Sequence, residues 1–282
     1  MNSYGMTINL HITNYCNMRC KGCYSHMYKN KNLKEKDWIK IIEKLAKELK
    51  EIEIKKINFV GGEPTLVPYL PNLVKKAKDL GFTTSIVTNG YLITKDYLKK
   101  FDNSLDLIGL SVDSLKKETL LFLGRHVNYK TLDYYKICFD IKEQNISLKI
   151  NTMVSNYNYK ENFTEFITKI KPIRWKVFQF LPIKGENDLY TPMLSINKEK
   201  FGLFKNINKD ANKVCPVIYE DNHTMIGSYI MVDSEGYPFT NINYKIKRGL
   251  NLLEYELLSQ LDELKFDFEK FKQRGGIYQI VK

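Results

Sequence analysis

The sequence predicts an α/β protein that folds as a partial (β/α)6 TIM-like barrel with a C-terminal extension. Its 282 residues are 43% hydrophobic and 13% aromatic, which is enough to fill a large core and excludes general disorder. Short β-rich runs alternate with helical patterns, as parallel strands joined by crossover helices do. Polar residues also follow one face of several strands. We place the barrel at residues 1–183 and the extension, which closes it, at residues 184–282.

Six runs of β-forming residues are predicted as parallel strands. They cover residues 6–12, 56–60, 84–88, 107–112, 148–154 and 174–181. Between the first two runs, apolar residues from Trp38 to Leu49 recur at helical spacing, and those from Leu70 to Leu80 repeat this pattern before the third run. Six such units fit either a partial barrel or an open, doubly wound sheet.

Polar side chains spaced two residues apart decide between these architectures. They share one face of the second, fifth and sixth strands and are Lys56 with Asn58, Lys149 with Asn151, and Arg174 with Lys176. Parallel strands buried on both faces would instead be nearly continuously apolar, and cations are rarely buried without a partner. We therefore favour a partly open barrel with a wet, positively charged interior. The alternative is that these strands lie at sheet edges with one solvated face.

Composition also limits the function. No run of 18 apolar residues predicts a transmembrane helix, and the first residues lack a secretory signal, so we expect a cytoplasmic protein. The chain has 44 Lys+Arg and 32 Asp+Glu, which gives a formal net charge of +12. This charge is compatible with nucleic acid, an anionic membrane or a phosphorylated small molecule, and it does not choose among them.

Three of the five cysteines lie directly after the first strand, with the spacing C-x3-C-x2-C. These are Cys16, Cys20 and Cys23. In a reducing compartment such clustering indicates metal or redox chemistry rather than disulfides. Three thiolates would leave one iron of a [4Fe–4S] cluster open, as catalytic metal sites require. A closed zinc site that includes His26 is the alternative. We expect Cys138 and Cys215 to be packed in the core.

The cysteine motif and the run Gly61-Gly62-Glu63-Pro64, which ends the second strand, together resemble the radical S-adenosylmethionine (SAM) superfamily. In that superfamily three thiolates bind a [4Fe–4S] cluster, and SAM chelates the open iron. The resemblance therefore implies both cofactors. Glycines allow close backbone approach, and Glu63 offers an acceptor for the SAM ammonium. Gly22 stands where the superfamily often has an aromatic residue, and Tyr24 follows the third cysteine.

Further motifs extend the resemblance over nearly the whole chain, at residues 56–64, 85–90, 111–114, 149–151, 174–179, 185–187, 228–229 and 274–278. In this order they resemble viperin and its microbial relatives. These enzymes convert a ribonucleoside triphosphate into its 3′-deoxy-3′,4′-didehydro analogue, which is an antiviral chain terminator. The resemblance implies abstraction of H4′, loss of the 3′-hydroxyl as water, and an extension that contributes to nucleotide binding.

The resemblance also implies the roles of individual residues. SAM would be held by Gly62, Glu63, Thr88, Asn89, Ser111 and Arg125, and the cluster by the three cysteines. Lys56 and Asn151 would meet the ribose, and the triphosphate would meet Lys149, Arg174, Lys176, Arg274 and Lys247, with Lys245 and Arg248 as rivals to Lys247. Tyr229 is the candidate catalytic residue for a late electron or proton step.

The tail is predicted to form a short helix at residues 268–273, followed by Arg274-Gly275-Gly276. The two glycines either stop the helix or present backbone N–H groups to phosphate. Folding of this tail over a bound nucleotide would exclude water from the reaction.

We expect the partners to be CTP, UTP or GTP as substrate and a flavodoxin or ferredoxin as electron donor. We expect no direct nucleic-acid binding, no membrane association and a monomer. Two other functions stay open at this point. One is a different radical SAM enzyme, which modifies peptides or activates glycyl-radical enzymes. The other is a basic, zinc-stabilised nucleic-acid-binding protein.

Overall fold

Ten strands form one sheet in the computed structural model, which describes residues 5–24, 31–53 and 55–278. The strand order is β10-β9-β8-β1-β2-β3-β4-β5-β6-β7. The first six strands are parallel and lie in chain order, which confirms the predicted units. They are β1 (Met6–His11), β2 (Lys55–Val60), β3 (Thr83–Thr88), β4 (Leu107–Ser111), β5 (Ser147–Val154) and β6 (Arg174–Gln179).

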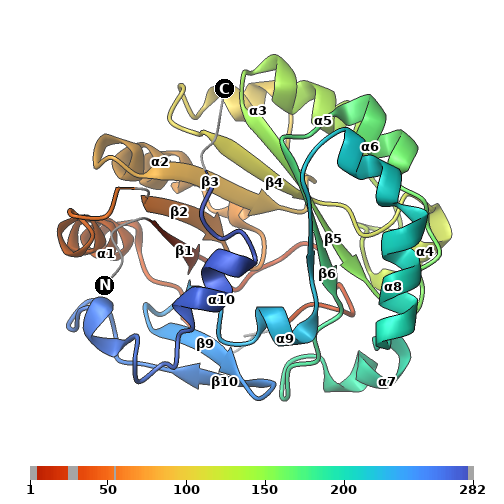
Figure 1. Cartoon of the computed structure of the whole chain (residues 1–282). Helices are drawn as coiled ribbons and strands as arrows, with labels where there is room; N and C mark the ends of the chain where they lie inside the picture. Colours follow the sequence, from red (N-terminus) through yellow and green to blue (C-terminus); the bar gives the residue numbers. More distant parts are fainter. Residues whose placement is uncertain (1–4, 25–30, 54, 279–282) are drawn as a thin grey trace.

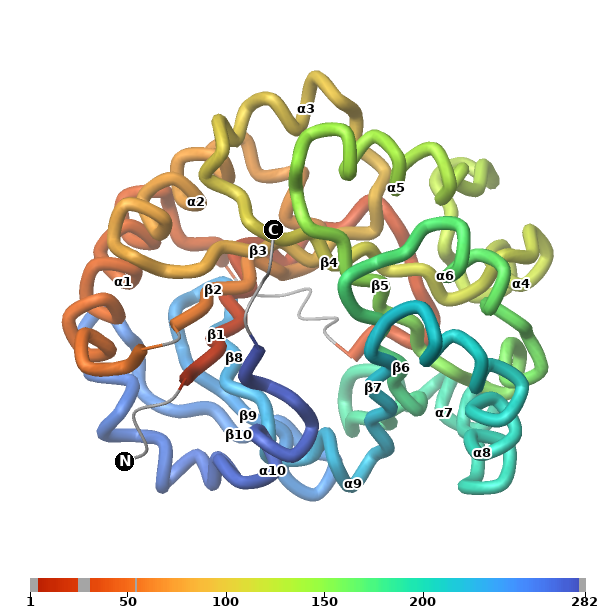
Figure 2. The backbone as a smooth tube through the Cα atoms, turned by 45° about the horizontal axis from the view of Figure 1, so that its top comes forward, coloured from red at the N-terminus to blue at the C-terminus, as the bar shows by residue number. Residues whose placement is uncertain are grey.

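The C-terminal part of the chain adds strands at both ends of this parallel set, which the sequence did not predict. Strand β7 (Val217–Glu220) lies parallel to β6. Strand β8 (Ile230–Val232) lies parallel to β1, and β9 (Pro238–Ile242) and β10 (Lys245–Arg248) continue antiparallel beyond it. The sheet curves around a central space without closing, and β7 and β10 are its two edges (Figures 1 and 2). The structure is therefore a partial barrel.

Helices cover the outer face of the curved sheet (Figure 2). The crossover helices are α1 (Glu35–Glu48), α2 (Leu70–Asp79), α3 (Lys95–Lys99), α4 (Lys117–Leu123), α5 (Tyr134–Glu143) and α6 (Thr164–Ile170). The later helices are α7 (Thr191–Leu194), α8 (Lys198–Ile207), α9 (Asn222–Met225) and α10 (Phe268–Gln273). Short 3-10 helices lie at Pro64–Leu66, Asp188–Tyr190, Lys209–Lys213 and Leu258–Gln260.

Each long crossover helix buries one apolar stripe against the sheet. In α1 the buried side chains include Trp38, Ile41 and Leu45, whose spacing places them on one helical face. Cys138 and Cys215 are also buried, as expected. This outer core leaves the inner face of the sheet free for polar side chains.

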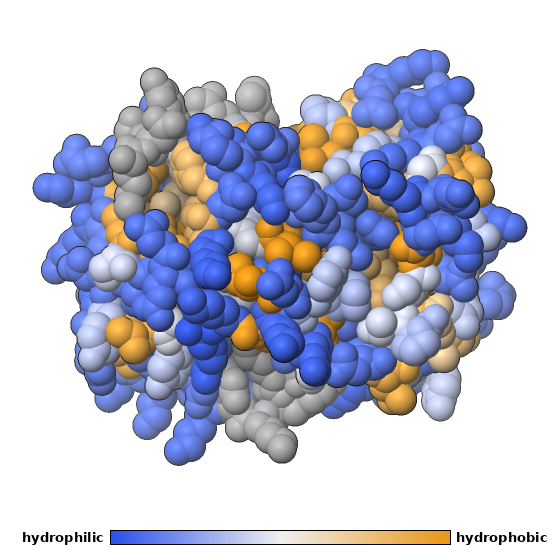
Figure 3. All heavy atoms as spheres, turned by 60° about the horizontal axis from the view of Figure 1, so that its bottom comes forward, coloured by the Kyte–Doolittle hydropathy of each residue, from blue (hydrophilic) through white to orange (hydrophobic). Residues whose placement is uncertain are grey.

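The molecular surface is mostly hydrophilic on the face shown in Figure 3, with smaller apolar areas between the charged side chains. In the part of the chain that the structure describes, no helix is both long enough and apolar enough to cross a membrane.

Candidate active site

A cavity inside the barrel brings nearly all the predicted site residues together. Its lining includes Cys16, Cys20, Cys23, Lys56, Gly62, Glu63, Thr88, Asn89, Ser111, Arg125, Lys149, Asn151, Lys176, Tyr229 and Arg274. Of the predicted residues, only Arg174 and Lys247 are absent from the lining. These residues come from opposite ends of the chain, and the curvature of the sheet is what places them around one space.

The loop that carries the cysteines is fixed by the end of α4. Backbone N–H of Lys21 donates to the carbonyl of Leu123 at 2.9 Å, and the Cys20 thiol donates to the carbonyl of Gly124 at 3.7 Å. Gly124 has φ +75°, and a Cβ there would lie 2.0 Å from the carbonyl oxygen of Arg19. Glycine is therefore required where α4 ends against the cysteine loop.

The chemistry of the three thiols fits an iron–sulfur cluster. All three line the same cavity, and cysteine thiolates are the usual ligands of [4Fe–4S] clusters. Burial raises the pKa of Cys20 to about 12, so binding of the metal must also release a proton. His26, from the zinc alternative, lies outside the described residues.

The backbone around Gly61 and Gly62 packs against the start of the cysteine loop. The N–H of Gly62 donates to Thr13 O, and that of Glu63 donates to Tyr15 O, both at 2.7 Å. A Cβ at Gly62 would lie 2.2 Å from the carbonyl oxygen of Tyr15. The close approach that the glycines permit is thus to the backbone of residues 13–15.

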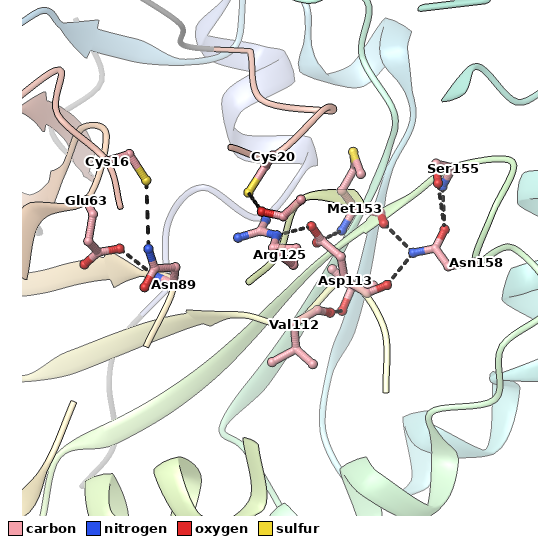
Figure 4. Close-up of polar contacts among 12 residues, drawn as sticks. Cys16, Cys20, Glu63, Asn89, Val112, Asp113, Arg125, Met153, Ser155 and Asn158 are labelled. Carbon is pink, nitrogen blue, oxygen red and sulfur yellow. Dashed lines mark hydrogen bonds and ion pairs between the residues drawn. The ribbon is translucent and has the colours of Figure 1, made fainter. Parts of the chain in front are cut away.

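Glu63 is buried, and both oxygens of its carboxylate accept hydrogen bonds. Its Oε1 accepts from the Thr65 N–H at 3.1 Å and from the Thr65 and Thr88 hydroxyls at 2.6 Å, and its Oε2 accepts from Asn89 N–H at 2.7 Å. Asn89 in turn directs its amide toward the Cys16 sulfur at 3.9 Å (Figure 4). A carboxylate held by four donors has a fixed position, as recognition of the SAM ammonium would require.

Arg125 is oriented by Asp113, a residue that the sequence analysis did not single out. Arg125 Nε donates to Asp113 Oδ2 at 2.6 Å, and Asp113 Oδ1 accepts from Met153 N–H at 2.9 Å (Figure 4). The Asn158 amide donates to Met153 O at 2.7 Å and also to the Asp113 carbonyl. This network connects the end of β4 with β5, beside the cysteine loop. Asp113 belongs to the motif at residues 111–114, so this motif could have indicated that Asp113 lies in the site.

The Met153 side chain occupies the space next to position 22, where an aromatic residue is frequent in the superfamily. A Cβ at Gly22 would lie 2.5 Å from the sulfur of Met153 and 3.6 Å from the ring of Phe180. Tyr24 lines the cavity instead. An aromatic side chain at position 22 would thus require the Met153 side chain to move.

Five buried cations lie close together near the other end of the cavity, and all except Arg174 line it. They are Lys56, Lys149, Arg174, Lys176 and Arg274, each no more than 7% exposed. Strand register brings four polar residues of β5 and β6 together, because Lys149 is opposite Arg174 and Asn151 is opposite Lys176. The positively charged interior expected from the polar strand faces is present.

Burial makes this group of lysines weak bases. Desolvation, with help from neighbouring arginines and against the attraction of Glu220, lowers the pKa of Lys149 to about 8 and that of Lys176 to about 7. Desolvation and the surrounding cations also lower the pKa of Lys56 well below its usual value. A polyanion in this space would favour the charged forms of all three lysines.

Glu220 and Tyr229 form a second network at the edge of the cation group. Glu220, at the end of β7, is fully buried and ion pairs with Lys176. Arg274 Nη1 lies 3.6 Å from the Glu220 carboxylate, and the Tyr229 hydroxyl donates to it. The Lys176 ammonium donates to the Tyr229 hydroxyl at 3.1 Å. No motif in the sequence indicated Glu220.

The tail packs across the cavity. Helix α10 has the predicted bounds, and the Arg274 guanidinium donates to the carbonyl of Ser228 at 2.7 and 3.1 Å. Arg174 donates to the Gly275 carbonyl at 2.8 Å, and its guanidinium carbon lies 4.3 Å from the centre of the Tyr278 ring. Arg174 thus faces the tail rather than the cavity.

The two tail glycines stop the helix. The N–H of Gly275 donates to Lys272 O at 2.7 Å, and that of Gly276 donates to Phe271 O at 2.8 Å. Both N–H groups are therefore engaged in capping α10, and the alternative in which they face a phosphate is wrong for this structure.

Lys247 does not reach the cavity, which corrects its predicted role. Side chains alternate along β10, and Ile246 is the residue of this strand that lines the cavity. Lys247 points to the opposite face, where its ammonium donates to the Glu263 carbonyl. Its rivals do not line the cavity either: Lys245 is exposed, and Arg248 pairs with Asp233 and Glu235.

Comparison with known proteins identifies the family. The radical SAM superfamily model matches residues 10–170. An S-adenosylmethionine-dependent nucleotide dehydratase from Flammeovirga pacifica is 38% identical over 97% of this chain and 95% of its own length. The chain belongs to the radical SAM nucleotide dehydratase family. It is therefore a radical SAM enzyme, and its family uses a [4Fe–4S] cluster and SAM.

Two further relatives of this chain are also named S-adenosylmethionine-dependent nucleotide dehydratase. The one from Lacinutrix mariniflava is 38% identical over 96% of this chain, which spans 58% of that relative's length. S-adenosylmethionine-dependent nucleotide dehydratase RSAD2 from Danio rerio is 32% identical over 96% of this chain and 77% of its own length. Membership of this family excludes the zinc-stabilised nucleic-acid-binding alternative.

Solved structures confirm the fold of this family member. Streptococcus suis SuiB bound to S-adenosylmethionine superposes with a TM-score of 0.69 at 18% identity, covering 97% of this chain and 68% of SuiB. The structure of anSMEcpe with bound AdoMet gives 0.69 at 16% identity, covering 95% and 82%. At such identities the likeness shows the fold alone.

Proposed function

We propose that this enzyme converts a ribonucleoside triphosphate into its 3′-deoxy-3′,4′-didehydro analogue. The observation that carries the proposal is the group of five buried cations inside the barrel, beyond the cysteine loop and the Gly-Gly-Glu-Pro turn. Among the described residues, Glu220 is the only carboxylate that ion pairs with them. When all five side chains are protonated, as a bound polyanion would favour, the group has an excess of about four positive charges, which suits a triphosphate with about four negative ones.

The cavity supports a division into two halves. In one half, Glu63 would hold the SAM ammonium and Arg125 with Ser111 the SAM carboxylate, beside the thiols that would bind the cluster. In the other half, Lys149, Lys176 and Arg274 would hold the phosphates, and Arg174 would hold the tail beside them through its bond to the Gly275 carbonyl. Lys56 on β2 and Asn151 on β5 would then meet the ribose between these halves. The Asn151 Oδ1 is buried and has no hydrogen-bond partner among the described residues, as expected of a group that awaits a hydroxyl.

When bound, the cluster and SAM would supply radical chemistry capable of taking H4′ from the ribose. The protein must then help the 3′-hydroxyl to leave as water, which requires one proton and one electron. The lowered pKa of Lys56 makes its ammonium a stronger acid than an exposed lysine, so it suits protonation of the leaving hydroxyl. Tyr229 is the candidate for the electron step, because its hydroxyl has a proton acceptor in Glu220.

The base is not selected by the contacts described above, so CTP, UTP and GTP are all proposed as substrates. A flavodoxin or ferredoxin is the proposed electron donor, and the monomer is the proposed active form. The extension from residue 184 would complete the nucleotide site through Glu220, Tyr229 and Arg274. The products would be chain-terminating antiviral nucleotides.

Anaerobic incubation of the reconstituted enzyme with SAM, a reductant and each of the four nucleotides tests this proposal. We expect 5′-deoxyadenosine and the didehydro nucleotide to form together with at least one of CTP, UTP and GTP. Absence of nucleotide-dependent 5′-deoxyadenosine with all four would contradict the proposed function. Unchanged product formation by Tyr229→Phe would remove that residue from the electron step.

A further inference from the structure

The buried carboxylate of Glu220 contacts several polar and charged side chains of the cavity. It lies behind the cavity, and three groups that line the cavity converge on it: Lys176, Tyr229 and Arg274. Glu220 is opposite Phe178 in the pairing of β7 with β6, whereas Tyr229 directly precedes β8, which pairs with β1. Glu220 therefore joins the two ends of the parallel strand set across the opening of the barrel.

The cations next to Glu220 determine whether its carboxylate is ionised. Burial by itself would raise the pKa of Glu220, but Lys176, Arg274 and the Tyr229 hydroxyl together hold it below its usual value. The carboxylate is thus ionised because these cations face it. Lys149 on β5 and Arg174 on β6 add to the positive field from the neighbouring strands, since Glu220 also acts on the charge of both.

We propose that Glu220 is a positioning residue that couples binding of the triphosphate to removal of the Tyr229 proton. The inference rests on the proposed function, because it assigns Lys176 and Arg274 to the phosphates. A triphosphate would compete with Glu220 for these two cations and would bring negative charge close to the carboxylate. Both effects increase the proton affinity of Glu220. The same carboxylate already accepts the hydrogen bond of the Tyr229 hydroxyl.

The proton and electron can then be followed in full. After H4′ is removed, Tyr229 gives one electron to the sugar radical while its O–H bond breaks and the proton passes to Glu220. The C3′–O3′ bond breaks, the C3′=C4′ double bond forms, and the leaving hydroxide takes a proton from Lys56 to become water. A one-electron donor protein reduces the neutral Tyr229 radical, which recovers its proton from Glu220. Lys56 is reprotonated by solvent.

Comparison of Glu220→Gln with the wild-type holoenzyme tests this coupling. The glutamine preserves size but is a poor proton acceptor. We expect the yield of didehydro nucleotide per 5′-deoxyadenosine to fall about 10- to 100-fold, as loss of a general base does. Nucleotide-dependent 5′-deoxyadenosine itself should stay within about threefold, since H4′ removal precedes the step. The KM for the nucleotide should not rise, because a competitor for two phosphate-binding cations is removed.

Four further variants make the test specific. Tyr229→Phe should lower the same ratio, and the Glu220→Gln, Tyr229→Phe double variant should lower it no further, because the two residues act in one step. Glu161→Gln is the matched control, since Glu161 is a buried carboxylate that accepts from Ser114 and does not line the cavity. It should keep the wild-type ratio. Glu220→Asp keeps the charge and should retain more of the ratio than glutamine does.

The outcomes separate the inference from the proposed function. A wild-type ratio in Glu220→Gln, with or without a raised KM, would overturn the inference and leave the proposed function intact. Equal losses in Glu220→Gln and Glu161→Gln would also overturn it. If Glu220→Gln does not fold, a wild-type ratio in Glu220→Asp together with a wild-type ratio in Tyr229→Phe overturns it. No nucleotide-dependent 5′-deoxyadenosine in the wild type would overturn both.

Discussion

Nucleotide binding should take up protons, because the buried lysines lose part of their charge in the free enzyme. A triphosphate that pairs with Lys149 and Lys176 would restore their full protonation. With pKa values of about 8 and about 7, these lysines are about half and about one-tenth protonated at pH 8. Lys149 and Lys176 should therefore together take up between about one and two protons on binding at pH 8, and Lys56 would add to this uptake.

The same two pKa values determine how the affinity for the nucleotide depends on pH. A group whose pKa rises on binding makes binding weaker as the pH increases through its free-state pKa. From pH 7 to pH 8 the two lysines together predict a Kd about tenfold higher. Lys149→Met should reduce this change to about fivefold, and Lys176→Met to about twofold. Lys247→Met is the matched control and should keep the tenfold change, because Lys247 faces away from the cavity.

Anaerobic titration calorimetry of the holoenzyme, in two buffers with different ionisation enthalpies, measures the proton uptake directly. The nucleotide's own terminal phosphate is almost fully ionised at pH 8, so it adds little there. Uptake near zero at pH 8 would refute the reasoning. So would equal pH dependence in Lys149→Met and Lys247→Met, because the cavity lysines would then not meet the phosphates.

Two further predictions concern the SAM half of the cavity. Gly62→Ala should destabilise the protein by about 1–3 kcal/mol in denaturant unfolding, since its Cβ would meet the Tyr15 carbonyl at 2.2 Å. The control Gly202→Ala, in α8 with nothing within 4 Å, should be neutral or slightly stabilising. Glu63→Gln should weaken SAM binding about 10- to 100-fold by equilibrium dialysis, whereas Glu161→Gln should not. An unchanged SAM affinity in Glu63→Gln would remove Glu63 from ammonium recognition.

The barrel strands were predictable because each is a distinct β-rich run between long amphipathic helices. The cation group was predictable in part for the same reason. Lysine and arginine at alternate positions of β5 and β6 had to share a face, and strand register then placed Lys149 opposite Arg174. The spacing of the cysteines and the Gly-Gly-Glu-Pro turn predicted the residues of the cofactor half of the site.

The strands of the extension were missed because they are short. β8, for instance, covers only Ile230–Val232. Glu220 was missed for a related reason, since one carboxylate in a four-residue strand forms no motif. Lys247 was misplaced because the face of a β10 side chain depends on register, which the local sequence does not contain.

The most direct test of the account follows the hydrogen at C4′. Each of the four ribonucleoside triphosphates, labelled with deuterium at C4′, would be incubated anaerobically with the reconstituted enzyme, SAM and a reductant. Mass spectrometry of the 5′-deoxyadenosine then reports where the hydrogen went. We predict one deuterium in the 5′-deoxyadenosine formed with the accepted nucleotide, together with a didehydro product that has lost it. Formation of unlabelled 5′-deoxyadenosine at the same rate with and without nucleotide would contradict the account.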